Sequence, residues 1–336
     1  MEMDRPIKVS IAMTTYNGEK YIRKQLGSIL SQTRQPDEVM ICDDGSTDQT
    51  ADLVQRFIEA NKLSSWHFSV NPHNLGYIEN FRQAIAKTTG GIVFLCDQDD
   101  IWFPEKIAEM TRRFDEDPCV KVLNSGFQKI DENGEPIYSK QRIGRSNNNL
   151  ITQKLKPKAV HPFGLNTIIW RNISPGCTLA FTQDMKEFYI EHNTGLCPHD
   201  WEINILGAVL NGLYFLNEAL TGYRIHSGNT IGLAELTLPE RLLANASDQR
   251  IALAEQELLR ADAYINAAWT SRLNDRQREV LSRFRRTARA RFRAIRDHHI
   301  GYWMRLLLTH PKDYLKLRGP QGILNDFRAV LKANRP

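Results

Sequence analysis

The sequence contains few cysteines and no long apolar run. Its five cysteines are scattered through the 336 residues, are odd in number and form no C-x-x-C pair, which argues against a disulfide framework and a zinc site. No apolar run reaches about 18 residues, so no membrane-spanning helix is expected. The first residues, MEMDRPIKVSIAM, include early acids and no apolar core of signal-peptide length. These absences predict a cytoplasmic protein with reduced thiols.

The sequence also lacks a strong excess of charge of either sign. Its 44 basic residues nearly balance the 39 acidic ones, and the formal net charge is +5. It has no glycine- and lysine-rich phosphate loop, no EF-hand spacing, no internal repeat and no low-complexity tract. A composition of 41% hydrophobic and 25% charged residues is typical of a globular chain with one large or two modest domains.

The first 110 residues alternate strand and helix signals. The expected strands are KVSIAMTTY (8–16), DEVMICDDGS (37–46), WHFSVN (66–71) and GGIVFLCD (90–97), and the expected helices are 19–31, 46–60 and 74–88. This alternation predicts a parallel sheet with helices on both faces and a ligand site beyond the carboxyl ends of its strands. A capping signal at Ser46, Thr47 or Asp48 is expected to begin the second helix.

Beyond residue 110 the pattern becomes less regular and then helical. DENGEP (131–136) predicts a hairpin turn, SPGC (174–177) predicts a tight turn, and the polar stretch 146–164 predicts a mobile loop. From about residue 238, Leu, Ala, Arg, Glu and Gln dominate at helical spacing. We therefore expect an α/β domain over 1–237 and a helical, basic extension over 238–336.

The expected strand at 90–97 ends in three carboxylates, Asp97, Asp99 and Asp100. Strand-end aspartates often cap the following helix, and this alternative accounts for the acids of DDGS (43–46). Three carboxylates within four residues exceed what one cap needs, and their mutual repulsion calls for a cation. Because Mg²⁺ binds few protein carboxylates and shares its remaining shell with phosphate and water, the pattern predicts a nucleotide-diphosphate site.

Two later motifs contain further titratable groups. PHDWEINILGAV (198–209) predicts a helix with Asp200 in its first turn, where a carboxylate can simply cap the helix and complement its positive end. YRIHSGN (223–229) contains His226, which is either a metal ligand or a hydrogen-bonded histidine in a turn.

In combination these segments resemble the N-terminal half of the family 2 inverting glycosyltransferases, which have the GT-A fold. The matching stretches are VSIAMTTYNGEKYIRKQLGSILSQT, DEVMICDDGSTDQT, NLGYIENFRQAI and GGIVFLCDQDDIWFPEKI, and they cover residues 7 to 110 densely. The resemblance continues thinly through SPGCTLAF (174–181), HDWEI (199–203) and YRIHSGNTIG (223–232). It implies an α/β fold class: a GT-A-like, doubly wound mixed sheet with a Rossmann-like nucleotide-binding half and a helical C-terminal extension.

The resemblance also implies a role for each matching residue. In the family, the position of Thr14 and Tyr16 holds the nucleotide base, and that of Asp44 contacts the base edge. Asp97 is the first acid of the D-x-D element, facing ribose or phosphate, and Asp99 is its metal-binding acid. The residues assigned to the nucleotide-sugar are Thr14, Tyr16, Asp44, Asn74, Asp97 and Asp99. A divalent cation, Mg²⁺ or Mn²⁺, is assigned to Asp99 and His226, and it neutralises the leaving diphosphate.

Asp200 falls where inverting enzymes of this family keep the general base that takes the proton of the acceptor hydroxyl. Trp102, Gly176, His199 and Trp201 are assigned to the acceptor side. The HDW version of the motif resembles the rhamnosyltransferase branch, which implies dTDP-L-rhamnose as donor and a glycan or lipid-linked glycan of bacterial surface polysaccharide as acceptor. The alternatives are a UDP-hexose donor, a non-catalytic nucleotide-sugar-binding assembly protein, and a nucleotidyltransferase. A nucleotidyltransferase would have a glycine- and lysine-rich phosphate loop near its N-terminus, and MTTYNGEKYI is a poor match to such a loop.

The extension contains an arginine-rich segment, LSRFRRTARARFRAIR (281–296), with seven arginines and no acid. Its apolar residues recur at helical spacing, which predicts a basic amphipathic helix, and HIGYWMRLLL (299–308) adds aromatic residues suited to an interface. Two alternatives stay open: peripheral contact of 281–308 with the inner face of the cell membrane, or packing on the catalytic domain with the arginines in solvent. No nucleic-acid partner is expected.

Overall fold

The computed structural model describes residues 7–138, 151, 153–226 and 247–332. The chain divides into two compact units, Met1–Gly164 with Asn172–Gly232, and Leu165–Arg171 with Leu233–Pro336. The second unit thus includes a short segment, Leu165–Arg171, that we expected in the α/β domain. The boundary expected at 237/238 lies outside the described residues and stays a prediction.

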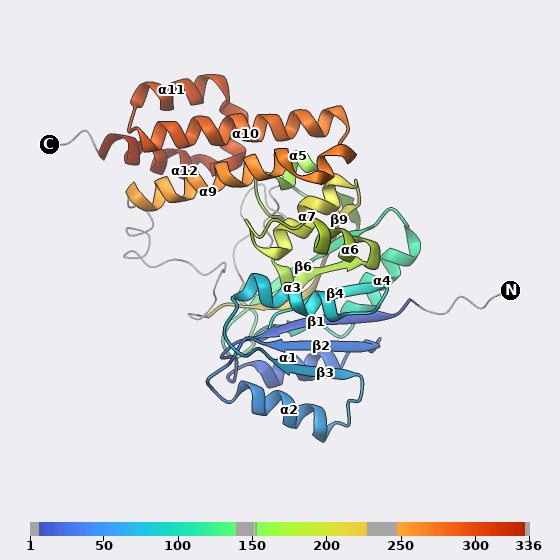
Figure 1. Ribbon diagram of the computed structural model, residues 1–336. Helices are drawn as coiled ribbons and strands as arrows, with labels where there is room; N and C mark the ends of the chain where they lie inside the picture. The colour runs from blue at the N-terminus through green and yellow to red at the C-terminus, as the bar shows by residue number, and fades with distance from the viewer. Residues whose placement is uncertain (1–6, 139–150, 152, 227–246, 333–336) are drawn as a thin grey trace. The chain divides into compact units, whose positions relative to one another are not determined.

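The first unit is built on a nine-stranded sheet in the order β3-β2-β1-β4-β8-β6-β9-β5, with β7 paired to β9. The strands are β1 (Val9–Thr15), β2 (Glu38–Asp43), β3 (Trp66–Val70), β4 (Ile92–Cys96), β5 (Ile101–Trp102), β6 (Val122–Ile130), β7 (Val160–Pro162), β8 (Leu179–Thr182) and β9 (Leu213–Arg224). Strands β1 to β4 pair in parallel, as Figure 1 shows for β1, β2 and β3. Because β8 is antiparallel to both β4 and β6, the sheet is mixed, as expected.

This unit has helices at four places where the apolar spacing predicts them, 19–31, 46–60, 74–88 and 198–209, and two further helices, at 106–116 and 183–192, that were not predicted. They are α1 (Ile22–Leu30), α2 (Thr50–Ala60), α3 (Tyr77–Lys87), α4 (Lys106–Glu116), the 3₁₀ turn η1 (Gly176–Thr178), α6 (Gln183–His192) and α7 (His199–Val209). Every residue of β1 and β4 is buried, as expected for parallel strands covered on both faces. Their apolar side chains join those of α1 and α4 in one hydrophobic core.

The predicted start of the second helix is wrong by several residues. Helix α2 begins at Thr50, and its N-cap residue, Gln49, makes no side-chain cap hydrogen bond. Ser46 instead donates its backbone N–H and its hydroxyl to the carboxylate of Asp43. Asp48 accepts the backbone N–H of Thr50. The polar residues that signalled a cap therefore form the loop between β2 and α2.

The predicted turns are confirmed, and one predicted loop is partly wrong. Asp131 closes the 131–136 turn by accepting the backbone N–H groups of Asn133, Gly134 and Glu135. The segment 174–177 turns tightly into η1. Of the loop expected at 146–164, residues 146–150 and 152 lie outside the described residues, and 160–162 form β7. That short strand was missed because its pairing with β9 is long-range.

The second unit is helical in its described part. Its elements are α5 (Leu165–Ile168), α9 (Ser247–Asn266), the 3₁₀ turn η2 (Ala268–Arg272), α10 (Asp275–Arg296), α11 (Ile300–Thr309) and α12 (Pro311–Lys332), which is kinked at Gly319. Figure 1 shows α9, α10 and α12 running side by side. An N-terminal capping box between Asn274 and Gln277 fixes the start of α10.

The arginine-rich segment forms part of α10, and its apolar face is not a membrane surface. Leu281, Phe284, Ala288 and Ile295 are all buried, and α10 packs against α9, α11 and α12 within the second unit. The expectation that this helix offers its apolar stripe to a membrane is therefore wrong. Among the residues that the structure describes, no helix has the length and apolarity to cross a bilayer.

A buried ion-pair network crosses the second unit. Arg291 and Asp326 are both fully buried and joined by two hydrogen bonds of 2.8 and 3.1 Å. Arg250 and the hydroxyl of Tyr314 also donate to Asp326, while Arg291 reaches Glu257 at 2.7 Å. Removing one member of such a network leaves an uncompensated charge in the interior.

We therefore expect Asp326→Ala to lower the free energy of unfolding of the helical unit by about 3 to 5 kcal/mol. Arg286→Ala is the matched control, because its pair with Glu279 is exposed and should contribute less than about 1 kcal/mol. Urea denaturation followed by circular dichroism gives both values. Equal, small losses in the two variants would contradict the assignment of the network as a stabilising core.

Candidate active site

The carboxyl ends of β1, β2 and β4 meet at one edge of the sheet, because the three strands are parallel neighbours. The acid-rich segment that follows β4 is tied to the end of β1 by Gln98. The side-chain oxygen of Gln98 accepts the backbone N–H of Tyr16 at 2.8 Å, and its amide nitrogen donates to the carbonyl of Tyr16 at 2.9 Å. The sequence analysis did not single out Gln98, which lies between Asp97 and Asp99. Thr14 is buried beside this bridge, whereas the Tyr16 side chain is exposed.

Asp44 organises the loop that connects β3 to α3. One carboxylate oxygen of Asp44 accepts the amide of Asn71 at 3.0 Å and the backbone N–H of Leu75 at 2.8 Å, and the other accepts the N–H of Gly76 at 2.9 Å. Asn74 also accepts the N–H of Gly76, a residue whose φ of 82° suits glycine. Asp44 and Asn74, both assigned to the nucleotide, therefore lie together and hold one loop at the strand ends.

Asp97, which is half-buried, and Asp100, which is buried, form an acidic pair at this edge. Burial, together with the charges of Asp100, Asp99 and Asp200, raises the pKa of Asp97 well above its usual range, although Asp97 accepts the backbone N–H of Cys177. Burial and the charge of Asp99 raise the pKa of Asp100 to about 7. Both raised pKa values result from burial and from neighbouring negative charges, which a cation or a proton has to offset.

Lys106 supplies a positive charge near these acids, and the sequence analysis did not single it out. It lies in the first turn of α4, is fully buried, and donates to the carbonyl of Cys177 at 2.8 Å and to the hydroxyl of Thr221 at 2.7 Å. Burial lowers the pKa of Lys106 to about 8, against the charges of Asp100 and Asp97. The available signal was a lysine six residues after Asp100.

Asp99 and His226 come together from distant parts of the chain. The Nε2 atom of His226 lies 2.8 Å from a carboxylate oxygen of Asp99, although 127 residues separate them. Arg224, also missed in the sequence, holds the two segments in place. Its backbone N–H donates to Asp100 at 2.9 Å and its Nε to the carbonyl of Asp99 at 2.6 Å. The structure thus brings together the two residues that were assigned to a cation.

The donor set at this edge fits a hard divalent cation. Carboxylate oxygens of Asp97 and Asp100 and the sulfur of Cys177 lie within 4.8 Å of one another, and Asp99 with His226 forms a separate pair at 2.8 Å. The carboxylates and the imidazole suit Mg²⁺ or Mn²⁺, whereas the thiol sulfur is a softer ligand. The raised pKa values of Asp97 and Asp100 supply an independent reason for a cation at this place.

Asp200 lies in the first turn of α7 and is buried. Asn172 donates to its carboxylate at 2.8 Å, and the backbone N–H of Trp201 donates to it as well, as the capping alternative requires. Burial nevertheless raises the pKa of Asp200 to about 6, and its charge acts on Asp97. A simple helix cap accounts for the contact with Trp201, and burial accounts for the raised pKa, but neither explains the contact with Asn172 or the nearness to Asp97.

A chain of three amides, of which Asn124 and Asn204 are buried, holds Asp200 in place. Asn124 in β6 donates to Asn204 in α7 at 2.7 Å, Asn204 donates to Asn172 at 2.9 Å, and Asn172 donates to Asp200. Sequence reasoning missed this chain. An asparagine inside each of two apolar runs, VLNSG and INILG, was the available signal, because buried amides need partners.

The residues assigned to the acceptor side lie in different surroundings. Trp102 is buried in the core beside Phe94, so its assignment to the acceptor is wrong: the pairing of β5 with β9 turns the ring inward. His199 is buried and stacked on Phe81 with ring centroids 3.9 Å apart, and burial lowers its pKa to about 3. Trp201 is half-buried.

Gly176 lies directly against the α7 acid. A Cβ atom at this position would lie 3.3 Å from a ring nitrogen of His199 and 3.4 Å from the Cβ of Asp200. The next residue, Cys177, donates its backbone N–H to Asp97. The η1 turn therefore links the D-x-D segment to Asp200, and glycine permits this close approach.

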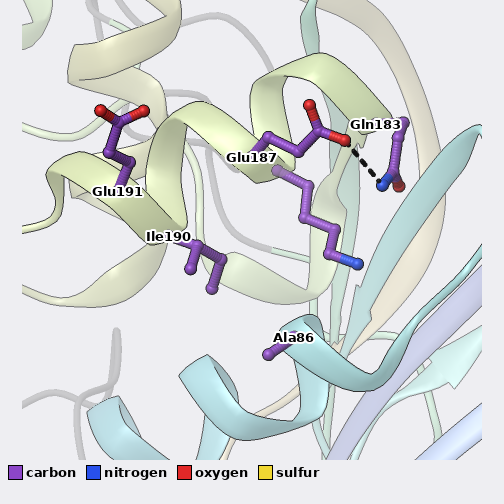
Figure 2. A pocket seen from close by; sticks show the side chains of 6 residues that line it. Ala86, Gln183, Glu187, Ile190 and Glu191 are labelled. Carbon is purple, nitrogen blue, oxygen red and sulfur yellow. Dashed lines mark hydrogen bonds between the residues drawn. The ribbon is translucent and has the colours of Figure 1, made fainter.

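A groove of about 300 Å³ lies between α3 and α6. Figure 2 shows its lining from α6, with Ala86 of α3 opposite. The lining residues are Ala86, Gln183, Lys186, Glu187, Ile190 and Glu191. None of them belongs to the acid cluster or to the candidate site, so this groove is not the nucleotide site.

Comparisons with known proteins agree with this geometry. Residues 10–174 match the family described as Glycosyl transferase family 2. An uncharacterized glycosyltransferase, alr2836, of Nostoc sp. is 26% identical over 77% of this chain and 75% of its own length. The dTDP-rhamnosyl transferase RfbG of Shigella flexneri is 26% identical over 66% of this chain and 73% of its own.

A solved structure shares the fold. S. aureus TarS 1–349 in complex with UDP-GlcNAc superposes with a TM-score of 0.58 at 20% identity, over 96% of this chain and 82% of that chain. The shared fold is the GT-A fold that the motifs predicted. Over residues 10–174, just under half of its length, the chain is similar to glycosyltransferase family 2.

Proposed function

We propose that the protein is an inverting glycosyltransferase that moves a sugar from a nucleotide-diphosphate donor to a hydroxyl group of a glycan acceptor. The observation that carries the proposal is the position of Asp200, a buried carboxylate with a raised pKa, close enough to the D-x-D segment for its charge to act on Asp97. A general base and a diphosphate site must be neighbours if one displacement is to join donor and acceptor.

In the proposed reaction the acceptor oxygen attacks the anomeric carbon from the side opposite the diphosphate. The new carbon–oxygen bond forms as the bond to the diphosphate oxygen breaks, and the nucleoside diphosphate leaves with the electron pair. Asp200 takes the proton of the acceptor hydroxyl. A single displacement inverts the anomeric centre, so one base is enough and no covalent sugar intermediate forms.

Asn172 and the η1 turn set the orientation of the Asp200 carboxylate and the space beside it. Asn172 donates to one carboxylate oxygen of Asp200 and so fixes the orientation of the carboxylate that is proposed to take the acceptor proton. Gly176 keeps the space beside Asp200 free of a side chain. Asp99 and His226 would hold a divalent cation, whose charge would stabilise the departing diphosphate, and Asp97, Thr14 and Tyr16 are proposed to contact the nucleotide.

For the donor we propose dTDP-L-rhamnose. The HDW motif and the similarity to a dTDP-rhamnosyl transferase support it. The similarity of fold to TarS, solved with UDP-GlcNAc, supports a UDP-hexose as the alternative. The proposed acceptor is a growing, lipid-linked glycan of bacterial surface polysaccharide, which places the reaction at the inner face of the cell membrane. A nucleotide-sugar-binding assembly protein without transferase activity is the alternative of another class.

The donor is tested by calorimetry with dTDP, UDP, GDP, CDP and their sugars in the presence of Mg²⁺ or Mn²⁺. We expect selective binding of dTDP-rhamnose that is lost in EDTA and at least tenfold weaker in Asp99→Ala. Asp52→Ala removes an exposed carboxylate and is the matched control. Selective binding of a UDP-sugar would overturn the rhamnose assignment alone, whereas donor affinity indifferent to EDTA would overturn the cation site.

Asp200→Asn separates an enzyme from a binding protein. The amide preserves size and keeps one accepting oxygen but takes up no proton, so we expect the transfer rate to fall by about 10² to 10⁴-fold while donor affinity stays within threefold. Radiolabelled sugar transfer and calorimetry measure the two quantities. Wild-type turnover in this variant would exclude Asp200 as the base.

The rate should also depend on pH through Asp200. The base is active as the carboxylate, and because burial raises its pKa to about 6, lowering the pH through 6 protonates it and the rate falls tenfold per unit below that point. Donor affinity is measured over the same range, since Asp100 titrates near pH 7. A rate at saturating donor that stays constant down to pH 5 would contradict the assignment.

A further inference from the structure

Helix α11 exposes apolar side chains on one side. Met304 and Leu308 are 54% and 80% exposed. They are one helical turn apart and therefore lie on the same side of α11. On another side, Trp303 packs against Ala254, Ile295, Ala329 and Val330. We call the exposed pair, Met304 and Leu308, the α11 face.

The sequence around the α11 face has an excess of positive charge. Between residues 298 and 325 it contains a single acid, Asp313. That carboxylate is buried and paired with Arg283. Arg305 and Lys312 are exposed in the same stretch. Within this stretch the exposed apolar side chains therefore occur with exposed basic side chains, and the single acid is buried.

We propose that the α11 face docks the protein on a membrane surface that contains anionic lipids. Apolar side chains flanked by arginine and lysine suit the boundary between acyl chains and anionic head groups. A second copy of the chain is a poorer occupant, because a symmetric contact would bring Arg305 and Lys312 against their own equivalents. The contact surface thus lies on α11, one helix beyond the arginine-rich α10.

This inference extends the proposed function, because a lipid-linked acceptor is reached at a membrane. It also corrects where the membrane contact lies within 281–308. The apolar side chains of α10 are buried by packing inside the helical unit, whereas the α11 face is exposed. Lipid binding needs neither a donor nor the base, so it is measured independently of glycosyl transfer.

The test is sedimentation of the full chain with vesicles of phosphatidylcholine alone or mixed with phosphatidylglycerol. We expect binding to the mixed vesicles only, and a partition coefficient at least tenfold lower in Leu308→Glu. Leu259→Glu is the matched control: the same substitution at a leucine of α9 in the same unit, 55% exposed. Thermal melting checks that both variants fold, and both should transfer sugar to a water-soluble acceptor at the wild-type rate.

A second pair of variants tests the charge. Arg305→Gln with Lys312→Gln should weaken binding to the mixed vesicles by about thirtyfold, since each basic side chain contributes a factor of about five near an anionic surface. Wild-type binding by Leu308→Glu, or equal losses in Leu308→Glu and Leu259→Glu, would overturn the proposal. So would a self-associating wild-type chain, measured by light scattering, that becomes monomeric in Leu308→Glu and binds no vesicles.

Discussion

The electrostatic crowding at the end of β4 is the constraint on which the site depends. Asp97, Asp99 and Asp100 follow a fully buried strand, and Asp200 adds a fourth carboxylate whose charge acts on Asp97. Lys106 supplies one buried positive charge, which cannot balance four acids. Burial and the neighbouring negative charges raise the pKa of Asp97 and Asp100, and burial raises that of Asp200. The N–H groups aimed at these acids offset part of the repulsion and the proposed divalent cation would offset more, so the architecture around β4 follows from where opposite charge and hydrogen-bond donors can be placed.

Distant segments supply those donors. The η1 turn gives Asp97 a backbone N–H through Cys177, and the end of β9 gives Asp100 the backbone N–H of Arg224. The same segments bring Gly176 against Asp200 and His226 against Asp99. The parts that stabilise the acids are therefore the parts that position the candidate base and the candidate metal ligand, which explains why one small region serves stability and chemistry at once.

The sequence was sufficient for the alternating half of the fold and for the acids, because periodicity and strand-end position are local properties. It was insufficient for Lys106, Arg224 and the amide chain through Asn172, whose roles exist only once strands far apart in the chain are paired. The assignment of Trp102 to the acceptor side was wrong for the same reason. An aromatic residue after an acid cluster suits an acceptor site, but the ring is buried where β5 pairs with β9. The local pattern identifies residue types, and the long-range register decides which way they face.

The helical unit shows the same limit in another form. An apolar stripe with arginines around it is what a membrane helix and a bundle helix both require, so spacing alone could not choose between them for α10. Partners on other helices decide the matter: Arg291 is matched by Asp326 and Glu257, and Phe284 is buried. Between residues 298 and 325, around the α11 face, the single acid is Asp313, which already pairs with Arg283. The basic side chains of α10 pair with acids inside the helical unit, so this helix belongs to the core of that unit. The basic side chains beside the α11 face have no such acid in their own stretch of sequence, and we propose that anionic lipids supply the opposite charge.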